Sequence, residues 1–396
     1  MKILLKNGKI ITPVRTINNG AVLIDNGKIE AVFENNKKIE TGNNVKVVDV
    51  KGNYISPGFI EIHTHGAGGY DFMDGDVQSI LGACKKHMEF GVTSIVPTTL
   101  TSTMEELFFM LDNFKIAKKE NKEGPNILGL HLEGPYFSME QKGAQDPRYL
   151  KDPDPVEYKK ILDYSNDIVR WTVAPELMGA MEMGRELRKR GILGSIGHSN
   201  AVYEEVLKAY ENGFTHLTHF YSGMSMVRRI NAYRYAGIVE SGYLIDEMTV
   251  EIIADGKHLP ASLLKLIMKV KGADRTCLVT DSMRAAGMPE GEYVLGSQKD
   301  GQRVIVEEGV AKLLDRSAFA GSVATTDRLV RTMINLADVS LEDAVKMITL
   351  TPARIMGIDG NKGSVSSGKD ADLIVFDKEI NVLMVIVNGK IELSQE

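Results

Sequence analysis

The sequence predicts an α/β protein centred on a TIM-type (β/α)8 barrel, with a smaller β module built from both ends of the chain. Two observations predict this fold. In the middle of the chain, eight short apolar runs alternate with longer helical patterns, which is typical of βαβ units with parallel strands. At both ends, strand-like segments are punctuated by Asn-Gly pairs, which favour β-hairpins. A doubly wound open sheet is the alternative for the middle part.

The end segments are expected to be all β. Residues 1–55 and 362–396 are assigned to the small domain and residues 56–361 to the barrel. Hairpins are expected at Asn7-Gly8, Asn26-Gly27 and Asn388-Gly389. The strand-like segments are 3–5, 21–24, 45–48, 372–376 and 383–387.

The eight apolar runs are the candidate barrel strands, because each is short and is followed by a helical pattern. They are residues 58–63, 93–97, 127–132, 169–173, 192–196, 215–220, 250–254 and 277–280. A hairpin-rich insertion is expected around 291–314, before the last helices.

Composition excludes several classes of protein. The chain has 396 residues and a net charge of -6, which argues against an extended basic surface for nucleic acid or an anionic membrane. No apolar stretch reaches the length of a membrane span, and the charged start is unlike a signal peptide. Cys84 and Cys277 are too few for a disulfide framework. We therefore expect a cytoplasmic enzyme without nucleic-acid or membrane partners.

Titratable side chains follow most of the predicted barrel strands. A polar residue normally follows an apolar strand, so the argument depends on the joint placement of five of the eight histidines. In TIM-type barrels the chemistry lies at the carboxyl ends of the strands, and imidazole and carboxylate groups ligate divalent cations there. The residues concerned are His63, His65, Glu133, His198, His219, Asp255, His258 and Asp281.

His63 and His65 are separated by one residue at the end of the first predicted strand. Side chains two apart on a strand point to the same face, so the two imidazoles can hold one cation together. A lone His-x-His pair occurs often by chance. The glycines that follow, beginning with Gly66, add weight because they let a substrate approach the backbone closely.

The remaining histidines are expected to have other roles. His216 and His219 are three apart, so a strand cannot point both inward, and His219 is the candidate ligand because it lies nearer the strand end. His131 lies deeper in its strand than Glu133 and is expected to be buried and hydrogen-bonded. His87 lies in a helical pattern beside lysines and is expected to be solvated.

Two acids are informative. Glu133 ends an apolar strand, where a carboxylate is costly to desolvate unless it is paired or bound to a metal. Asp281 follows the eighth run in the same way, and a helix N-cap is its alternative role.

Taken together, these residues resemble the N-acetylglucosamine-6-phosphate deacetylase family of the amidohydrolase superfamily. The resemblance covers essentially the whole chain, from Ser56-Pro57-Gly58 to Asn388-Gly389-Lys390. The motifs that carry it are His63-x-His65-Gly66, His131-Leu132-Glu133-Gly134-Pro135, Gly197-His198-Ser199, Thr218-His219, Ala254-Asp255-Gly256-x-His258, Thr280-Asp281 and Ala320-Gly321-Ser322.

The resemblance implies a barrel flanked by a small β-sandwich made from both chain ends. It also implies that Glu133, His198 and His219 are the principal metal ligands. His63 and His65 complete a second metal position, with Glu133 bridging. The expected cofactor is one or two divalent cations per subunit, zinc in the first place, with iron, manganese, cobalt or nickel as alternatives. A homodimer is expected.

The same resemblance implies a mechanism. A bound cation lowers the pKa of water, so that hydroxide attacks the acetamide at neutral pH. Asp281 is expected to take the water proton and deliver it to the departing amine. His258 is expected to hydrogen-bond the carbonyl oxygen as it gains negative charge.

Substrate contacts are also carried over from the family. Arg234 is the best match for the phosphate-binding arginine, and Arg228 and Arg229 are the alternatives. Ser222-Gly223 stands where the family usually has Asn-Ala, which changes one sugar or phosphate contact. The remaining contacts are Ala144 and Gln145 on the sugar or phosphate side, and Phe319, Ala320 and Gly321 on the acetyl side.

Three functional hypotheses remain open on the sequence. The leading one is deacetylation of an N-acetyl-hexosamine 6-phosphate, of the gluco or the galacto epimer. The second is hydrolysis of a different amide, because a fold does not fix a function. The third is a non-catalytic protein that retains the barrel, although none of the five ligands is missing.

Overall fold

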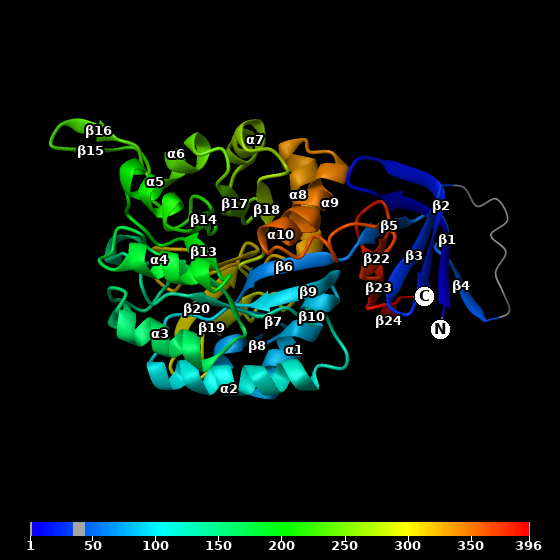
Figure 1. The fold of residues 1–396 in the computed structure, drawn as a ribbon, viewed down its shortest axis with the longest axis horizontal. Helices are drawn as coiled ribbons and strands as arrows, with labels where there is room; N and C mark the ends of the chain where they lie inside the picture. The colour runs from blue at the N-terminus through cyan, green and yellow to red at the C-terminus, as the bar shows by residue number, and fades with distance from the viewer. Residues whose placement is uncertain (1, 35–43, 396) are drawn as a thin grey trace.

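A computed structural model describes residues 2–34 and 44–395 of the chain. Residues 35–43 and 396 of the predicted small domain therefore lie outside the described residues, as does residue 1. Figure 1 shows two parts: a larger body of strands and helices, and a smaller β part that contains both chain ends.

Strands from both ends of the chain form one eight-stranded sheet, in the order β24-β23-β22-β5-β1-β2-β3, with β4 beside β1. The predicted association of the two ends is therefore confirmed, whereas the domain boundaries stay a prediction. The strands are β1 (Lys2–Ile11), β2 (Thr16–Asp25), β3 (Lys28–Phe33), β4 (Val45–Asp49), β5 (Tyr54–Pro57), β22 (Leu373–Phe376), β23 (Val382–Val387) and β24 (Lys390–Ser394).

Two of the three predicted Asn-Gly hairpins are present. Asn26-Gly27 joins β2 to β3 and Asn388-Gly389 joins β23 to β24, and all four residues have positive φ, as a tight hairpin turn requires. The hairpin predicted at Asn7-Gly8 is wrong. Strand β1 runs through this pair with a shift in its pairing to β2, so the positive φ of Asn7 serves a β-bulge.

The eight predicted barrel runs all contain parallel strands. They form a three-stranded sheet, β10-β9-β6, and a six-stranded sheet, β11-β12-β13-β14-β17-β18, and every pair in both is parallel. The strands are β6 (Phe59–Thr64), β9 (Val92–Pro97), β10 (Asn126–Ile127), β11 (Leu130–Glu133), β12 (Ile168–Val173), β13 (Leu193–Ile196), β14 (Phe214–Leu217), β17 (Thr249–Ile252) and β18 (Thr276–Leu278).

Backbone hydrogen bonds also link the margins of these two sheets. The amide of Asp281, just after β18, donates to the carbonyl oxygen of His63 on β6 over 2.9 Å. On the other side, the amide of Thr99 donates to the carbonyl oxygen of His131 over 3.0 Å. The first predicted strand therefore meets the eighth, and the second meets the third.

Helices follow the strands along the chain and bury apolar faces against them. α1, for example, buries Ile80, Ala83, Cys84, His87 and Met88, which is the spacing of one helical face. The helices are α1 (Val77–Met88), α2 (Met104–Glu120), α3 (Pro155–Tyr164), α4 (Ala180–Lys189), α5 (Tyr203–Glu211), α6 (Ile238–Leu244), α7 (Ala261–Val270), α8 (Thr326–Ala337), α9 (Leu341–Ile348) and α10 (Leu350–Ile355).

The short elements complete the chain. The insertion predicted at 291–314 is confirmed as an antiparallel three-stranded sheet of β19, β20 and β21. A further hairpin, β15–β16, projects from the body of the molecule (Figure 1). The elements are β7 (Gly66–Ala67), β8 (Tyr70–Asp71), β15 (Arg228–Ile230), β16 (Tyr233–Tyr235), β19 (Gly291–Leu295), β20 (Gln302–Glu307), β21 (Val310–Leu313), and the 3-10 helices Phe72–Asp74, Met139–Gln141 and Pro147–Tyr149.

Across residues 2–34 and 44–395, no helix is both long and apolar enough to pass through a lipid bilayer.

Candidate metal centre and substrate cavity

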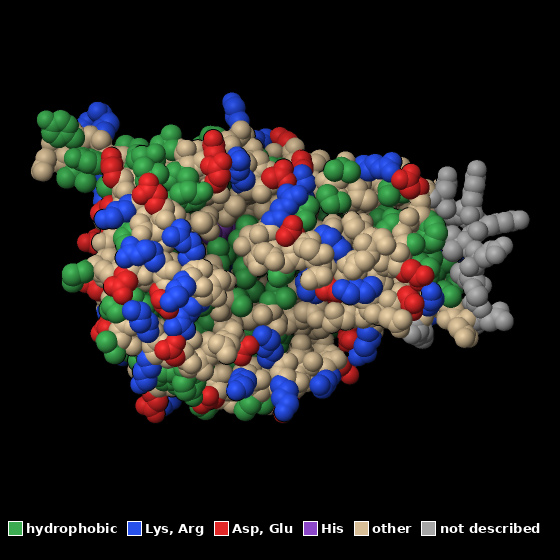
Figure 2. All heavy atoms as spheres, in the orientation of Figure 1, with side chains coloured by type: hydrophobic (Ala, Val, Ile, Leu, Met, Phe, Trp, Pro, Cys, Tyr) green, Lys and Arg blue, Asp and Glu red, His purple; other side chains and the backbone are tan. Residues whose placement is uncertain are grey.

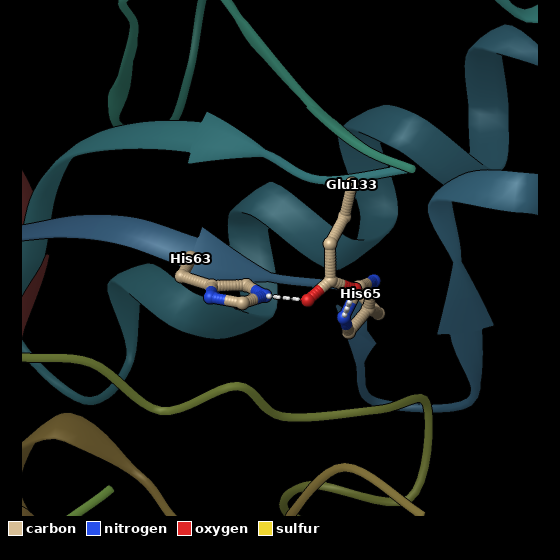
Figure 3. Close-up of side chains that lie close together, drawn as sticks. All are labelled: His63, His65 and Glu133. Carbon is tan, nitrogen blue, oxygen red and sulfur yellow. Dashed lines mark ion pairs between the residues drawn. The ribbon is translucent and has the colours of Figure 1, made fainter. Parts of the chain in front are cut away.

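His63, His65 and Glu133 converge from the carboxyl ends of two parallel strands. His63 is on β6, His65 directly follows it, and Glu133 is the last residue of β11. Figure 3 shows both imidazoles turned toward the Glu133 carboxylate. His63 Nε2 lies 3.5 Å from Glu133 Oε1, and His65 Nε2 lies 3.4 Å from Glu133 Oε2. The His-x-His spacing thus places both rings on one face, as predicted.

His198 and His219 approach the same carboxylate from the other side. Their Nε2 atoms lie 3.4 and 3.0 Å from Glu133 Oε1 and 3.1 Å from each other. His198 follows β13 and His219 follows β14, each by two residues. Glu133 therefore belongs to two groups whose ligand atoms lie within 4.8 Å of one another, one with His63 and His65 and one with His198 and His219.

The hydrogen bonds of these rings leave their Nε2 atoms facing inward. Nδ1 of His198 donates to the carbonyl oxygen of Gln141 over 2.8 Å, and Nδ1 of His219 donates to that of Ser222 over 3.1 Å. Because a carbonyl only accepts, Nδ1 carries a hydrogen in each ring, and Nε2 is the atom that faces Glu133 and can ligate a cation once it holds no proton.

His63 repeats this arrangement. Its Nδ1 atom bonds Glu251 over 2.6 Å, while its buried Nε2 atom has no hydrogen-bond partner and lies 3.5 Å from Asp281 Oδ1. Imidazole nitrogens and carboxylates that converge in this way repel one another unless protons or a cation lie among them. The donor set of nitrogen and carboxylate oxygen suits a divalent transition metal.

The buried charges stabilise one another. Burial would raise the pKa of Glu133, but the surrounding imidazoles, led by His63, hold it well below its ordinary value. The same balance lowers the pKa of Asp281, where His63 and His65 outweigh burial. Conversely, burial would lower the pKa of His219, but Glu133 raises it to about 9. Both acids of the centre are therefore ionised at neutral pH.

Three of the site residues adopt left-handed backbone conformations. The φ angles are 48° at His198, 31° at His219 and 46° at Asp281. Side chains other than glycine adopt this region rarely and at a cost, and such residues cluster at functional sites. Each lies just past a parallel strand, so the turn of the backbone aims its side chain into the space above the strand ends.

His258 stands at the edge of this space with its orientation fixed. Its Nδ1 atom donates to Asp255 over 2.9 Å, and its ring packs against Phe319 with centroids 4.5 Å apart. Asp255 also accepts the backbone amide of His258 over 2.8 Å. The Nε2 atom is therefore the one left to contact a ligand.

A cavity of about 210 Å³ lies over the centre. It is bounded by six of the seven predicted metal or catalytic residues, all but His63, and by most of the predicted substrate contacts. The lining residues are His65, Leu100, Glu133, Gly143, Ala144, Gln145, His198, His219, Ser222, Gly223, His258, Asp281, Leu295, Ala318, Phe319 and Gly321.

Two predicted substrate contacts are not at the cavity. Ala320 is fully buried in the apolar cluster of the inserted β19–β21 sheet, because side chains alternate along this segment and only Phe319 and Gly321 face the cavity. Arg234 lies on the exposed hairpin β15–β16. Within the described part of the chain, no arginine or lysine lines the cavity.

The alternative arginines lie on the same hairpin. Arg229 pairs directly opposite Arg234, and both are exposed. Arg228 is turned back to the body of the protein, where its guanidinium bonds the side chain of Asn200 and, over 2.6 Å, its backbone carbonyl oxygen. None of the three arginines predicted for phosphate binding therefore lines the cavity.

Gln145 has a second contact that the sequence did not indicate. Its Nε2 atom donates to Glu133 Oε2 over 2.7 Å, and its Oε1 atom accepts from the amide of Thr101 over 3.0 Å. The side chain therefore supports the Glu133 carboxylate while lining the cavity.

Two other histidines lie where the sequence predicts. His131 is buried and bonds Thr172 over 2.7 Å and Thr98 over 3.2 Å. His216 is buried beneath the centre and bonds Thr249 over 2.8 Å. Neither ring faces the cavity.

The prediction that His87 is solvated is wrong. The residue is 1% exposed, and its Nε2 atom bonds Thr64 Oγ1 over 2.8 Å. The neighbouring lysines suggested solvent, but His87 lies four residues after Ala83 and so falls on the buried face of α1. Burial lowers the pKa of His87 to about 4.

This depressed pKa predicts an acid sensitivity. Below pH ~6.5 the unfolded chain binds a proton at His87 that the folded chain does not take up until pH ~4, so stability is lost as the pH falls through this window. Between pH 7 and 5, protonation of His87 in the unfolded chain is expected to lower the free energy of unfolding of the wild type by about 2 kcal/mol. In His87→Gln this part of the loss should be absent. Urea unfolding at the two pH values measures this, and parallel losses in both proteins would contradict it.

Two buried charges were missed by the sequence interpretation. Arg170 on β12 and Glu251 on β17 are fully buried and form an ion pair of 2.6 Å. The signal was present, since each is a single charge inside an apolar run, Val169-Arg170-Trp171 and Val250-Glu251-Ile252. Opposite charges in two buried strands indicate a pair, because neither is tolerated alone.

Four imidazoles and a glutamate meet beneath a cavity at the carboxyl ends of parallel strands. This arrangement is typical of metal-dependent hydrolases built on parallel strands. A sequence profile of the amidohydrolase family matches residues 54–391, so the chain belongs to this family, whose members are generally metal-dependent.

Individual relatives within this family identify a narrower group of enzymes. N-acetylglucosamine-6-phosphate deacetylase of Haemophilus influenzae is 34% identical over 395 residues, which is 98% of this chain and 99% of the relative. N-acetylgalactosamine-6-phosphate deacetylase of Escherichia coli O157:H7 is 33% identical over 352 residues, 88% of this chain and 90% of the relative. The predicted resemblance to the N-acetylglucosamine-6-phosphate deacetylase family is confirmed.

A solved structure agrees with this relationship along the whole chain. The N-acetyl-D-glucosamine-6-phosphate deacetylase of Mycobacterium smegmatis, crystallised as an aspartate-to-alanine mutant with N-acetyl-D-glucosamine-6-phosphate, superposes with a TM-score of 0.90 at 27% identity. The match covers 99% of this chain and 100% of the other.

Proposed function

We propose that the chain is a metal-dependent deacetylase that converts N-acetylglucosamine 6-phosphate to the amino sugar phosphate and acetate. The observation that carries this proposal is the convergence of four imidazoles and two carboxylates at the base of a cavity. The names of its relatives support the substrate class.

The side chains divide the chemistry among them. Glu133, His198 and His219 would hold one cation, and His63 with His65 would add a second position. When bound, a divalent cation, zinc in the first place, supplies Lewis acidity and lowers the pKa of water from ~15.7 towards ~7. Iron, manganese, cobalt or nickel would suit the same donor atoms.

Proton transfer falls to Asp281. It lines the cavity and is ionised, so it can accept the proton of the attacking water and pass it to the amide nitrogen, which must be protonated before it leaves. His258, held through Nδ1 by Asp255, has Nε2 free to donate to the carbonyl oxygen as negative charge develops. Phe319 and Gly321 then bound the acetyl side, and Ala144, Gln145, Ser222 and Gly223 the sugar side.

We also propose that the two parallel sheets form one closed TIM-type barrel and that the terminal sheet is part of a β-sandwich. The hydrogen bonds between His63 and Asp281 and between His131 and Thr99 support closure. Closure would gather all strand ends around one axis and so explain why the site residues meet.

A homodimer is proposed as the source of the phosphate contact. The hairpin β15–β16 projects from the body, and it exposes Ile230 and Tyr233 beside Arg234 (Figure 1). Figure 2 shows apolar and basic side chains together at this tip. An exposed apolar hairpin suits contact with a second copy, and a planar guanidinium suits the bidentate recognition of phosphate.

Arginine variants test this proposal. Arg234→Ala is expected to raise KM for the phosphorylated sugar by roughly 10- to 100-fold, since a charged hydrogen bond contributes about 1.5–3 kcal/mol. The activity of the variant on the unphosphorylated sugar should equal that of the wild type. Arg229→Ala, directly opposite in the hairpin, is the matched control, and Arg228→Ala completes the set. Equal effects of Arg234→Ala on both sugars, or a fully active monomer in sedimentation, would contradict the proposal.

A substrate panel tests the reaction itself. Acetate release is measured from N-acetylglucosamine 6-phosphate, N-acetylgalactosamine 6-phosphate and both unphosphorylated sugars, with the metal content determined on the same sample. We expect the highest kcat/KM on the gluco 6-phosphate. A higher value on the galacto epimer would replace the substrate, and no acetate from a metal-loaded sample would refute deacetylation.

A further inference from the structure

A buried carboxylate lies directly beneath the candidate metal centre. Glu251 on β17 is fully buried and accepts hydrogen bonds from four donors. Its Oε1 atom contacts His63 Nδ1 at 2.6 Å and the backbone amide of His219 at 3.0 Å. Its Oε2 atom contacts Arg170 Nη1 at 2.6 Å and His216 Nε2 at 3.2 Å. One side chain thus joins residues from both halves of the centre.

Glu251 is not itself a cation ligand, although His216, Glu251 and Cys277 lie close enough together to form a third group. The guanidinium of Arg170 already supplies the positive charge at this place. Its remaining nitrogens are held by Ser195 Oγ at 3.1 Å and Thr218 Oγ1 at 2.8 Å. Both oxygens of Glu251 are therefore occupied by hydrogen-bond donors, and its negative charge is balanced by Arg170.

The contact with His63 decides what that ring presents to the cavity. Because Glu251 also accepts from a guanidinium, it is the acceptor and His63 Nδ1 carries the hydrogen. The lone pair is then on Nε2, the atom that has no partner and faces Glu133 and Asp281. A ring without this anchor can rotate, or take the other tautomer, and present a hydrogen in place of the lone pair.

We propose that Glu251, held by Arg170, is the positioning residue that makes His63 a metal ligand and thereby sets the capacity of the centre for a second cation. The inference rests on the proposed metal-dependent function and extends it to a residue pair outside the cavity. Carboxylates that orient a ligating imidazole commonly contribute ~10- to 100-fold in metal affinity. Glu251 contacts His219 only through its backbone amide, and the His219 ring is held separately by the carbonyl oxygen of Ser222, so we expect the first cation to be retained when the contact with the His63 ring is lost.

The test is a zinc titration of chelator-stripped protein by equilibrium dialysis, with metal content measured by mass spectrometry. The wild type is expected to bind two equivalents. Glu251→Gln is expected to retain the first and to weaken the second by ~10- to 100-fold. Glu61→Gln is the matched control, because Glu61 is equally buried but contacts the backbone amides of His63 and Thr280, not a ring. It should bind both equivalents.

Two further variants keep the test decisive. If Glu251→Gln does not fold because Arg170 is left unpaired, the double variant Arg170→Leu/Glu251→Met removes both charges together and should show the same loss. In a His63→Ala background, Glu251→Gln should cause no further loss of zinc, since it acts through His63. If Glu251 had a purely structural role, its substitution would weaken the binding of both zinc equivalents.

Each outcome decides the inference. A wild type that binds one equivalent, a Glu251→Gln protein whose second equivalent is within about twofold of the wild type, or an equal loss of both cations would overturn it. Acetate release is assayed separately on the same samples. Absence of acetate with the expected zinc pattern would reject the proposed reaction and leave the role of Glu251 standing.

Discussion

Glu133→Gln is expected to abolish tight metal binding and to lower acetate release by ~10³-fold or more. Glu133 lies within 3.0 to 3.5 Å of all four imidazoles, so its charge would serve both cation positions. Glutamine keeps the shape but not the charge, and the Lewis acidity that is lost with the metal is equivalent to several kcal/mol of barrier. Metal analysis and a continuous acetate assay measure both effects.

The matched control is Glu157→Gln on α3. This carboxylate accepts from the Tyr136 hydroxyl over 2.8 Å and lies away from the centre, so metal content and activity should stay at wild-type values. A Glu133→Gln protein that retains a full metal complement would show that the carboxylate is not a ligand.

Asp281→Asn is expected to lower kcat by ~10²- to 10⁴-fold while the metal content is retained. The amide can neither take a proton from water nor deliver one to the departing nitrogen. Asparagine tolerates the left-handed backbone of this position, where φ is 46°, so the substitution adds no strain. Steady-state kinetics together with metal analysis separate loss of proton transfer from loss of the cation.

Asp274→Asn provides the comparison. Asp274 lies before the amino end of β18, whereas Asp281 follows its carboxyl end. The Asp274 carboxylate pairs with Arg354 over 2.9 Å and is not among the residues that line the cavity. It should keep full activity. If Asp281→Asn retained wild-type kcat, the assignment of proton transfer to Asp281 would have to be abandoned.

Local patterns in the sequence sufficed for the strands and for the ring pair. Each apolar run became a parallel strand, and the spacing of His63 and His65 placed both rings on one face because side chains alternate along a strand. The burial of His87 was also predictable, since its position follows the 3.6-residue period of α1, but the adjacent lysines led to the opposite interpretation.

Features that depend on distant segments were not accessible in this way. Arg170 and Glu251 are 81 residues apart, and β13 and β14 lie between their strands in the sheet, so their ion pair exists only once the sheet has formed. The direction in which the hairpin of Arg234 projects is likewise set by packing, so the sequence did not indicate that this predicted phosphate contact lies away from the cavity wall.

The most direct test of the account is acetate release from N-acetylglucosamine 6-phosphate by one sample measured before chelation, after removal of its metal, and after zinc is restored. The account predicts activity, then a loss of at least ~10²-fold without unfolding, then recovery in proportion to the zinc bound. Undiminished acetate release by protein shown to be free of metal would contradict it.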